Sequence, residues 1–268
     1  MFDMHYAMAN TVIDEPLIYP ILIPTKNRPE GKSFKLLQDL PCHKYIIVEP
    51  QDFEKYIHLN EDYTVIKMPE NNMGLPYARN FLKKFAEKKY DWWWQIDDDI
   101  SGFFETKNRK NVKISPNKAL YEAQQLFKKL PVAIGSLEYQ QFAWSQTKDF
   151  KLNSYADCVV CFNTKRTKPY SYDNNQQLKQ DRDMVLQVLS DGQFTMRTST
   201  ISFGAPTMGT NKGGLQSVYR AEKEKTSVEN LIKKWGKNIV TMQIKDQAQG
   251  KRYDAKINWK RFKVNINV

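Results

Sequence analysis

Trp92-Trp93-Trp94-Gln95-Ile96-Asp97-Asp98-Asp99 joins an apolar run to three consecutive carboxylates. Adjacent carboxylates repel one another and lose solvation when buried, so a fold that places them at the end of a core strand usually has a cation to hold. Side chains alternate between the two faces of a strand, so we expect Asp97 and Asp99 to point one way and Asp98 the other. The stretch therefore predicts a core strand that ends in a pair of hard oxygen ligands suited to Mg²⁺ or Mn²⁺.

The residues before this stretch alternate between strand-like and helix-like patterns. Beginning with a strand, these patterns follow one another at 17–23, 33–40, 45–48, 52–58, 63–68, 75–89 and 92–96. Such alternation favours right-handed βαβ units and a largely parallel sheet, with ligands at the carboxyl ends of the strands. The Asp triplet falls at one such end. We therefore predict an α/β fold with a mixed, largely parallel sheet flanked by helices.

The residues after the triplet give a more mixed pattern. We expect a basic polar loop at 102–116, a helix at 117–130, and strands near 132–137, 141–144 and 158–162. A further helix is expected at 180–189, with Asp181 and Asp183 in its first turn. Acidic side chains there stabilise the helix dipole, which is a structural explanation for both that needs no catalytic role.

Composition limits the kind of protein this is. The 268 residues are 41% hydrophobic, enough for one large domain or one domain with an appendage. The net charge of +11 favours polyanionic partners such as nucleic acid, and residues 221–268 carry 12 basic against 5 acidic side chains. Residues 1–15 lack the apolar core of a signal peptide, and no apolar stretch is long enough to cross a membrane. We expect a cytoplasmic protein without a membrane partner, and infer no obligate protein partner.

A set of motifs in a fixed order carries a family resemblance. The set is Ile23-Pro24-Thr25-Lys26-Asn27-Arg28-Pro29, Glu49, Asn71-Asn72-Met73-Gly74-Leu75-Pro76-Tyr77-Ala78-Arg79-Asn80 and the Asp triplet. Together these resemble the nucleotide-sugar half of a GT-A glycosyltransferase, and Gln180-Asp181-Arg182-Asp183-Met184 resembles the acidic motif that opens the acceptor-side helix of that fold. More narrowly, the first motif, the Trp-rich strand and Gly209-Thr210-Asn211-Lys212-Gly213-Gly214 look like the TET-associated glycosyltransferases. The resemblance covers roughly residues 17–220.

Members of that family, largely encoded by phages, are associated with sugar addition to hydroxymethylated pyrimidines in DNA. The resemblance implies a GT-A-like, Rossmann-related domain at 1–220, with a nucleotide-sugar half at about 17–100 and an acceptor half at about 101–220. The basic segment 221–268 would pack on this domain or extend it. The implied reaction moves a sugar from a UDP-linked donor to 5-hydroxymethylcytosine or 5-hydroxymethyluracil in DNA, in the host cytoplasm if the protein is phage-encoded. Glucose and arabinose are both left open as the sugar.

The resemblance also assigns residues to the donor site. Asp99, with Asp97, would hold the Mn²⁺ or Mg²⁺ that bridges the two phosphates, and Asp97 could instead contact the ribose. Gly74 allows close backbone approach, and Arg79, one turn into the following helix, can reach a phosphate or pair with Asp97. The complete donor-binding set comprises Pro24, Thr25, Asn27, Arg28, Glu49, Asn72, Gly74, Arg79, Asp97 and Asp98.

Asp181 is the candidate general base for the acceptor hydroxyl, and Asp183 is its rival. One direct displacement assisted by such a base would invert the anomeric configuration. The chain departs from the family pattern in having Gln180 where Glu is common. No histidine follows His58, so water, the diphosphate or another oxygen ligand must complete the shell of a bound cation.

Basic residues supply the candidate nucleic-acid contacts. They are Lys107, Arg109, Lys110, Lys212, Lys251, Arg252, Lys260 and Arg261, with Lys212 equally able to meet a donor phosphate. Three other functions stay open. The first is a GT-A glycosyltransferase with a protein or polysaccharide acceptor. The second is a metal-dependent nuclease or nucleotidyltransferase, and the third is a non-catalytic nucleic-acid-binding module.

Overall fold

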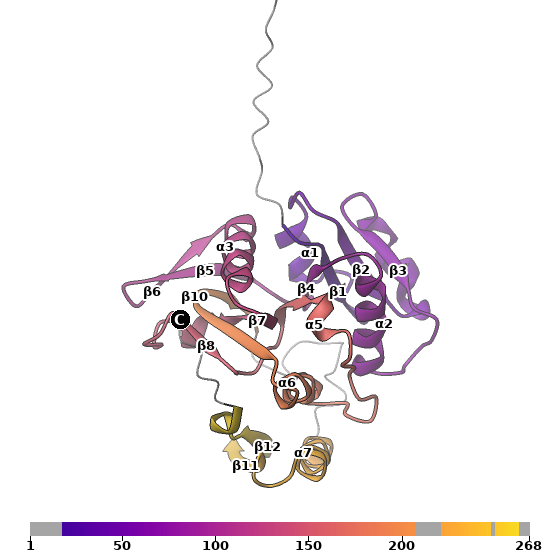
Figure 1. Ribbon diagram of the computed structural model, residues 1–268. Coiled ribbons are helices and arrows are strands. Elements are labelled where there is room, and N and C mark those ends of the chain that lie inside the picture. Colours follow the sequence, from indigo (N-terminus) through magenta and orange to yellow (C-terminus); the bar gives the residue numbers. More distant parts are fainter. Residues whose placement is uncertain (1–17, 207–220, 248–249, 263–268) are drawn as a thin grey trace, which may run out of the picture.

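Four parallel strands form the half of the sheet that leads to the Asp triplet. They are β1 (Ile21–Pro24), β2 (Lys44–Val48), β3 (Thr64–Lys67) and β4 (Trp92–Ile96), joined by α1 (Lys32–Leu37), the 3₁₀ helix η1 (Pro50–Leu59) and α2 (Leu75–Glu87). The computed structural model describes residues 18–206, 221–247 and 250–262, and in it these strands lie in the order β3-β2-β1-β4 (Figure 1). The alternation predicted from the sequence is therefore confirmed.

The side chains of β4 explain why this strand lies in the middle of the sheet. Trp93, Trp94 and Ile96 are fully buried, and Trp93 stacks on Phe162 with 4.4 Å between ring centroids. Strands covered on both faces are apolar at consecutive positions, as β4 is apart from the buried Gln95. Because the two indoles are packed in the core, they fix the position of β4 within the sheet. The carboxylates that directly follow β4 are positioned with it.

The second half of the sheet is mixed in direction. The strands are β5 (Gly102–Lys107), β6 (Lys110–Ile114), β7 (Val132–Tyr139), β8 (Phe150–Leu152), β9 (Val159–Asn163) and β10 (Phe194–Gly204). The helices are α3 (Pro116–Lys128), α4 (Gln140–Ala143), α5 (Thr164–Thr167) and α6 (Gln180–Ser190). From β4 the order continues β9-β7-β10-β5-β6, with β8 on β10. Strand β9 runs antiparallel to β4 and β7, whereas β7 and β10 are parallel. The predicted fold class, a mixed sheet flanked by helices, is confirmed.

Two local predictions for this half were wrong. The expected loop at 102–116 contains the β5–β6 hairpin, whose turn residues Asn108 and Arg109 adopt left-handed conformations with φ of 48° and 60°. A two-residue turn with positive φ at both positions matches the twist of a hairpin, but without glycine it gave no sequence signal. The strand expected at 141–144 is instead α4, because the alternating Phe142 and Trp144 are exposed and do not mark a buried face.

The C-terminal elements pack beneath α6. They are α7 (Ala221–Trp235), the antiparallel pair β11 (Val240–Gln247) and β12 (Gly250–Ile257), and the 3₁₀ helix η2 (Trp259–Phe262) (Figure 1). Leu186 of α6 shares a small apolar core with Val228, Leu231 and Ala255. The boundary at residue 220 stays a prediction, because 207–220 lie outside the described residues. Within the described ranges no helix is long and apolar enough to span a membrane.

Candidate active site

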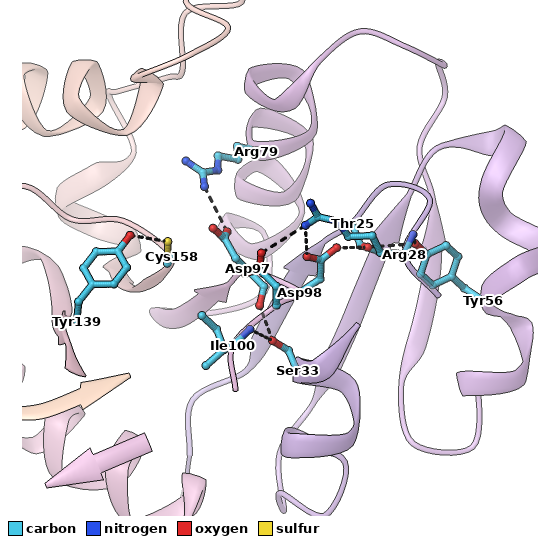
Figure 2. Close-up of polar contacts among 11 residues, drawn as sticks. Thr25, Arg28, Ser33, Tyr56, Arg79, Asp97, Asp98, Ile100, Tyr139 and Cys158 are labelled. Carbon is cyan, nitrogen blue, oxygen red and sulfur yellow. Dashed lines mark hydrogen bonds and ion pairs between the residues drawn. The ribbon is translucent and has the colours of Figure 1, made fainter. Parts of the chain in front are cut away.

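The three carboxylates at the end of β4 divide between the interior and the surface. Asp98 is 4% exposed, whereas the side chains of Asp97 and Asp99 keep 28% and 25% of their surface exposed. Thr25 Oγ1 donates to Asp98 Oδ2 at 2.5 Å, and Arg28 NH1 donates to Asp98 Oδ1 at 2.9 Å (Figure 2). Asp97 and Asp99 are therefore the more exposed members of the triplet, and Asp98 holds the loop that follows β1, while Arg28 NH1 also lies 3.5 Å from Asp99 Oδ2.

That loop is fixed by residues that the sequence did not single out. Tyr56 of η1 accepts from the backbone N–H of Arg28 at 2.7 Å, and its hydroxyl lies 3.1 Å from Thr25 Oγ1. Burial raises the pKa of Tyr56 to about 12, so its phenol stays protonated. Asn27, at φ 51°, donates its backbone N–H to Asp52 Oδ2 at 2.9 Å. The loop is therefore preorganised by η1.

The start of α1 fixes the backbone of the triplet. Ser33 Oγ donates to the carbonyl oxygen of Asp97 at 2.6 Å and accepts from the N–H of Ile100 at 2.9 Å (Figure 2). A Cβ on Gly31 would lie 2.7 Å from the carbonyl oxygen of Asp98, closer than real Cβ contacts come. Glycine at this position therefore allows α1 to approach the triplet.

Arg79 approaches the triplet from α2. Its NH2 donates to Asp97 Oδ1 at 3.3 Å, the pairing expected from the sequence (Figure 2). Burial alone would lower the pKa of Arg79, but the charge of Asp97 and those of Tyr172 and Asp181 raise it. Burial raises the pKa of Asp97 to about 6 against the opposing charge of Arg79, with a further contribution from Asp99. This concentration of partly desolvated negative charge favours a cation.

The side chains of Glu49 and Asn72 both contact Lys26, which was not among the predicted donor-binding residues. Lys26 Nζ lies 2.9 Å from Glu49 Oε2 and donates to Asn72 Oδ1 at 2.7 Å. Gln51 Nε2 donates to the buried Glu49 at 2.6 Å. The structure thus joins the segments after β1, β2 and β3, with Asn72 at φ 59° and Gly74 at φ 86° leading into α2. Glu49 already has two donors here, so a ligand would share it with Lys26.

The two candidate bases of α6 have different surroundings. Asp181 is partly exposed and interacts electrostatically with Arg79, Tyr172 and Asp157, so it faces the same region as Asp97. Asp183 is fully buried and accepts from Trp235 Nε1, Lys234 Nζ and Gln187 Nε2, at 2.8, 2.8 and 2.9 Å respectively. Asp183 therefore joins α6 to α7, whereas Asp181 is the more exposed of the two acids.

A buried charged cluster lies next to the triplet across β9 and β7. Arg197 is 1% exposed and contacts Glu138 at 2.9 Å and Asp157 at 3.4 Å. Tyr139 donates to Asp157 Oδ2 at 3.3 Å, and its hydroxyl is 3.1 Å from Cys158 Sγ. The carbonyl oxygen of Cys158 in turn accepts from the backbone N–H of Asp97 at 2.8 Å. Sequence reasoning missed this cluster because its members come from β7, β10 and the segment before β9 and belong to no local motif.

The donor set at the triplet fits a hard cation that keeps part of its water shell. Asp97 and Asp99 offer two partly exposed carboxylates, the ligands that Mg²⁺ and Mn²⁺ accept together with water and phosphate oxygens. Nowhere in the described ranges do three or more His, Cys, Asp or Glu side chains gather as a metal-binding group. The remaining ligands would therefore come from solvent and substrate, as the lack of a late histidine also suggested.

The basic residues predicted to meet nucleic acid lie on two surfaces. Lys107, Arg109 and Lys110 are exposed on the β5–β6 hairpin, and Lys107 pairs with Glu105 at 3.0 Å. The C-terminal residues Lys251, Lys260 and Arg261 are exposed, and Arg252 lies 3.6 Å from Glu224. Lys212 lies outside the described residues. Their contact with DNA stays a prediction.

The C-terminal hairpin holds the start of α6 through Asp254. Arg182 NH1 donates to Asp254 Oδ1 at 2.6 Å, and Lys179 Nζ lies 3.0 Å from the same oxygen. Burial alone would raise the pKa of Asp254, but Arg182 and Lys179 hold it well below its usual range. Lys179 is left-handed at φ 61° and precedes α6, so this ion pair orients the turn that carries Asp181.

Asp254→Asn is expected to lower the free energy of unfolding at pH 7 by about 1–3 kcal/mol, the typical cost of losing hydrogen bonds to a charged group. Because the pKa of Asp254 is lower in the folded state, its ionised form stabilises the fold above about pH 4. That contribution shrinks as the pH falls below this value and is lost completely only below the folded-state pKa, so the difference between the two proteins should be clearly smaller at about pH 3 than at pH 7. Denaturant unfolding at both pH values measures this, with Asp246→Asn on the same hairpin expected to change stability by less than about 0.5 kcal/mol. A difference that stays constant with pH would contradict the ion pair.

Comparison with known proteins gives one match that bears on function. Residues 19–214 match the model of a family described as TET-Associated Glycosyltransferase. No curated protein matches the chain. Among solved structures, the inositol-1-phosphate CTP transferase from T. maritima is similar with a TM-score of 0.40 and 9% sequence identity. That alignment covers 70% of this chain and 89% of the other, and at this TM-score it carries no argument about function.

Proposed function

This chain belongs to the TET-associated glycosyltransferase family, and we propose that it moves a sugar from a UDP-linked donor to the hydroxymethyl group of a modified pyrimidine in DNA. The observation that carries the proposal is the match of residues 19–214, which includes both the triplet and Asp181. The acceptor base would be 5-hydroxymethylcytosine or 5-hydroxymethyluracil.

The charges after β1, β2 and β4 suit a nucleoside diphosphate. Arg28, Arg79 and Lys26 bring three cations to the carboxyl ends of these strands, where ligands of open α/β sheets bind. Guanidinium groups pair well with phosphate oxygens, and the Nε of Arg79 is a buried donor with no partner in the described part of the chain. These residues would bind and orient the diphosphate of the donor.

Asp97 and Asp99 are the residues that would hold a divalent cation. When bound, the cation supplies neutralisation of the negative charge that develops on the departing diphosphate. Asp98 supports them indirectly, because its carboxylate is committed to Thr25 and Arg28. The protein thus contributes two ligands and a preorganised loop.

Asp181 would take the proton of the acceptor hydroxyl. As that proton moves to the Asp181 carboxylate, the hydroxyl oxygen forms a bond to the anomeric carbon, and the bond from that carbon to the diphosphate breaks. One such displacement inverts the anomeric configuration. The positive charges of Arg79 and Arg182 interact with the charge of Asp181.

Release of UDP tests the proposal. With a UDP-sugar and a divalent cation, release is expected with DNA that contains 5-hydroxymethylcytosine or 5-hydroxymethyluracil, and not with unmodified DNA of the same sequence. UDP release that requires a protein or polysaccharide in place of modified DNA would show that the acceptor is not DNA. Cleavage of DNA without UDP release would favour the nuclease alternative, and unchanged DNA binding with no reaction would favour a binding module.

A further inference from the structure

The β5–β6 hairpin and α4 form two walls of a groove on the acceptor side of the site. The groove has a volume of about 150 Å³, and its lining includes Thr106, Arg109, Trp144, Lys148 and Asp149. Pockets that enclose a drug-sized ligand have volumes of roughly 300–1,000 Å³, so this smaller groove suits a small group such as a phosphate. Figure 1 shows the hairpin at the edge of the sheet opposite β3, away from the donor half.

The surface around the groove is basic. The hairpin and residues 140–151 carry six basic side chains, Lys107, Arg109, Lys110, Lys113, Lys148 and Lys151, against the two acids Glu105 and Asp149. Arg109 and Lys148 line the groove and are exposed, and neither has an acidic partner within 4 Å in the described part of the chain. Asp149 offsets part of this charge, but the excess favours a polyanion.

Trp144 is an exposed aromatic side chain held in a fixed orientation. It is 50% exposed, yet its Nε1 donates to the carbonyl oxygen of Gln141 at 3.0 Å. Ser145 and Gln146 both donate to the carbonyl oxygen of Phe142, each at 2.9 Å, which closes the end of α4. An indole that is already ordered and half open to solvent loses little entropy when a ring stacks on it.

Both walls of the groove start at the active site. Strand β5 begins at Gly102, just after the triplet, and α4 begins after Tyr139, whose hydroxyl contacts Asp157 and Cys158. A strand rises about 3.3 Å per residue, so Thr106 lies roughly 13 Å along β5 from Gly102. This is about four steps of 3.4 Å along a DNA strand.

From these observations we propose that the groove binds the DNA strand beside the target nucleotide, with a backbone phosphate on Arg109 and Lys148 and a base stacked on Trp144. Exposed aromatic rings beside basic side chains are the means by which proteins hold unpaired nucleotides without reading sequence. The proposal rests on the proposed DNA acceptor and identifies where that acceptor is held outside the catalytic residues.

Binding of oligonucleotides containing 5-hydroxymethylcytosine, followed by fluorescence anisotropy, tests the groove. Trp144→Ala is expected to weaken binding of single-stranded DNA about 5- to 100-fold, and Trp144→Phe, which keeps a ring, by less. Arg109→Asn removes the charge but retains a residue type that tolerates the left-handed turn, and should reduce the slope of log K against log[salt] by about 1. Lys88→Ala, an exposed lysine directly after α2 on the donor half, is the matched control and should leave the affinity and the salt dependence unchanged.

Transfer activity measured on the same variants separates the two proposals. If the wild-type protein glycosylates the DNA while Trp144→Ala and Arg109→Asn retain its affinity and KM for DNA, the groove is not the binding site although the proposed function stands. If the wild-type protein transfers no sugar but its DNA affinity still depends on Trp144 and Arg109, the groove is the DNA-binding site and the proposed sugar transfer to DNA is wrong. Salt-independent binding of a neutral oligosaccharide that Trp144→Ala abolishes would assign the groove to a glycan and overturn its assignment to DNA.

Discussion

Asp181→Asn is expected to lower kcat for sugar transfer about 100- to 10,000-fold while leaving the KM for the nucleotide sugar nearly unchanged. A positioned general base contributes an acceleration of this order, and asparagine cannot accept the proton. Asp181 lies in the first turn of α6 and interacts with Arg79, which contacts Asp97, so the substitution removes the carboxylate without touching the triplet directly. Steady-state kinetics on hydroxymethylated DNA measures both constants.

Asp183→Asn is the matched comparison on the same helix. Its carboxylate receives hydrogen bonds from Trp235, Lys234 and Gln187 in a fully buried position, so the expected effect is a lower melting temperature. Activity per folded molecule should change far less than for Asp181→Asn. If Asp183→Asn folds normally and loses kcat while Asp181→Asn retains it, the roles of the two acids are reversed.

Asp99→Asn is expected to lower turnover about 1,000-fold at low Mn²⁺ and to raise the Mn²⁺ concentration needed for half-maximal activity. Stabilisation of the leaving diphosphate by a cation is worth several kcal/mol, and each 1.36 kcal/mol corresponds to a tenfold change in rate. Asp99 keeps a quarter of its side-chain surface exposed, which suits a ligand that shares a cation with water and substrate. Kinetics over a range of Mn²⁺ concentrations measures the shift, and a chelator should abolish wild-type activity until the cation is restored.

Asp91→Asn provides a control at the opposite end of the same strand. Asp91 is exposed and directly precedes β4, so its loss leaves the triplet intact and should not change the Mn²⁺ requirement. Full activity of the wild-type protein after exhaustive chelation would contradict the metal role of Asp97 and Asp99, because Arg28 and Arg79 would then supply the necessary charge alone.

The parts of the fold that follow local rules could be predicted from the sequence. The alternation from β1 to β4 depends only on periodicity within a few residues. The β5–β6 hairpin was missed because Asn108-Arg109 lacks the glycine that usually marks such a turn, and β10 because its run of polar residues hides its burial. In both cases tertiary contacts determine the structure.

In the site, too, contacts between residues distant in sequence could not be predicted. Arg79 was expected to reach a phosphate or Asp97 because it lies one turn into the helix that follows Gly74, and the structure places Arg79 NH2 3.3 Å from Asp97 Oδ1. The partners of Asp98 were identified as donor residues, but their bond to a carboxylate about 70 residues away depends on the parallel pairing of β1 with β4. The roles of Lys26, Tyr139 and Arg197 could not be predicted, because their partners lie on segments that are distant in sequence.

Mass spectrometry of the DNA product tests the central claim most directly. DNA with 5-hydroxymethylcytosine or 5-hydroxymethyluracil would be incubated with the protein, a divalent cation and a panel of nucleotide sugars that includes UDP-glucose and a UDP-pentose. The expected result is a mass gain of one sugar residue on the modified base, absent from unmodified DNA and lost with Asp181→Asn. No mass gain on either DNA, together with transfer to a protein or polysaccharide, would contradict the DNA acceptor.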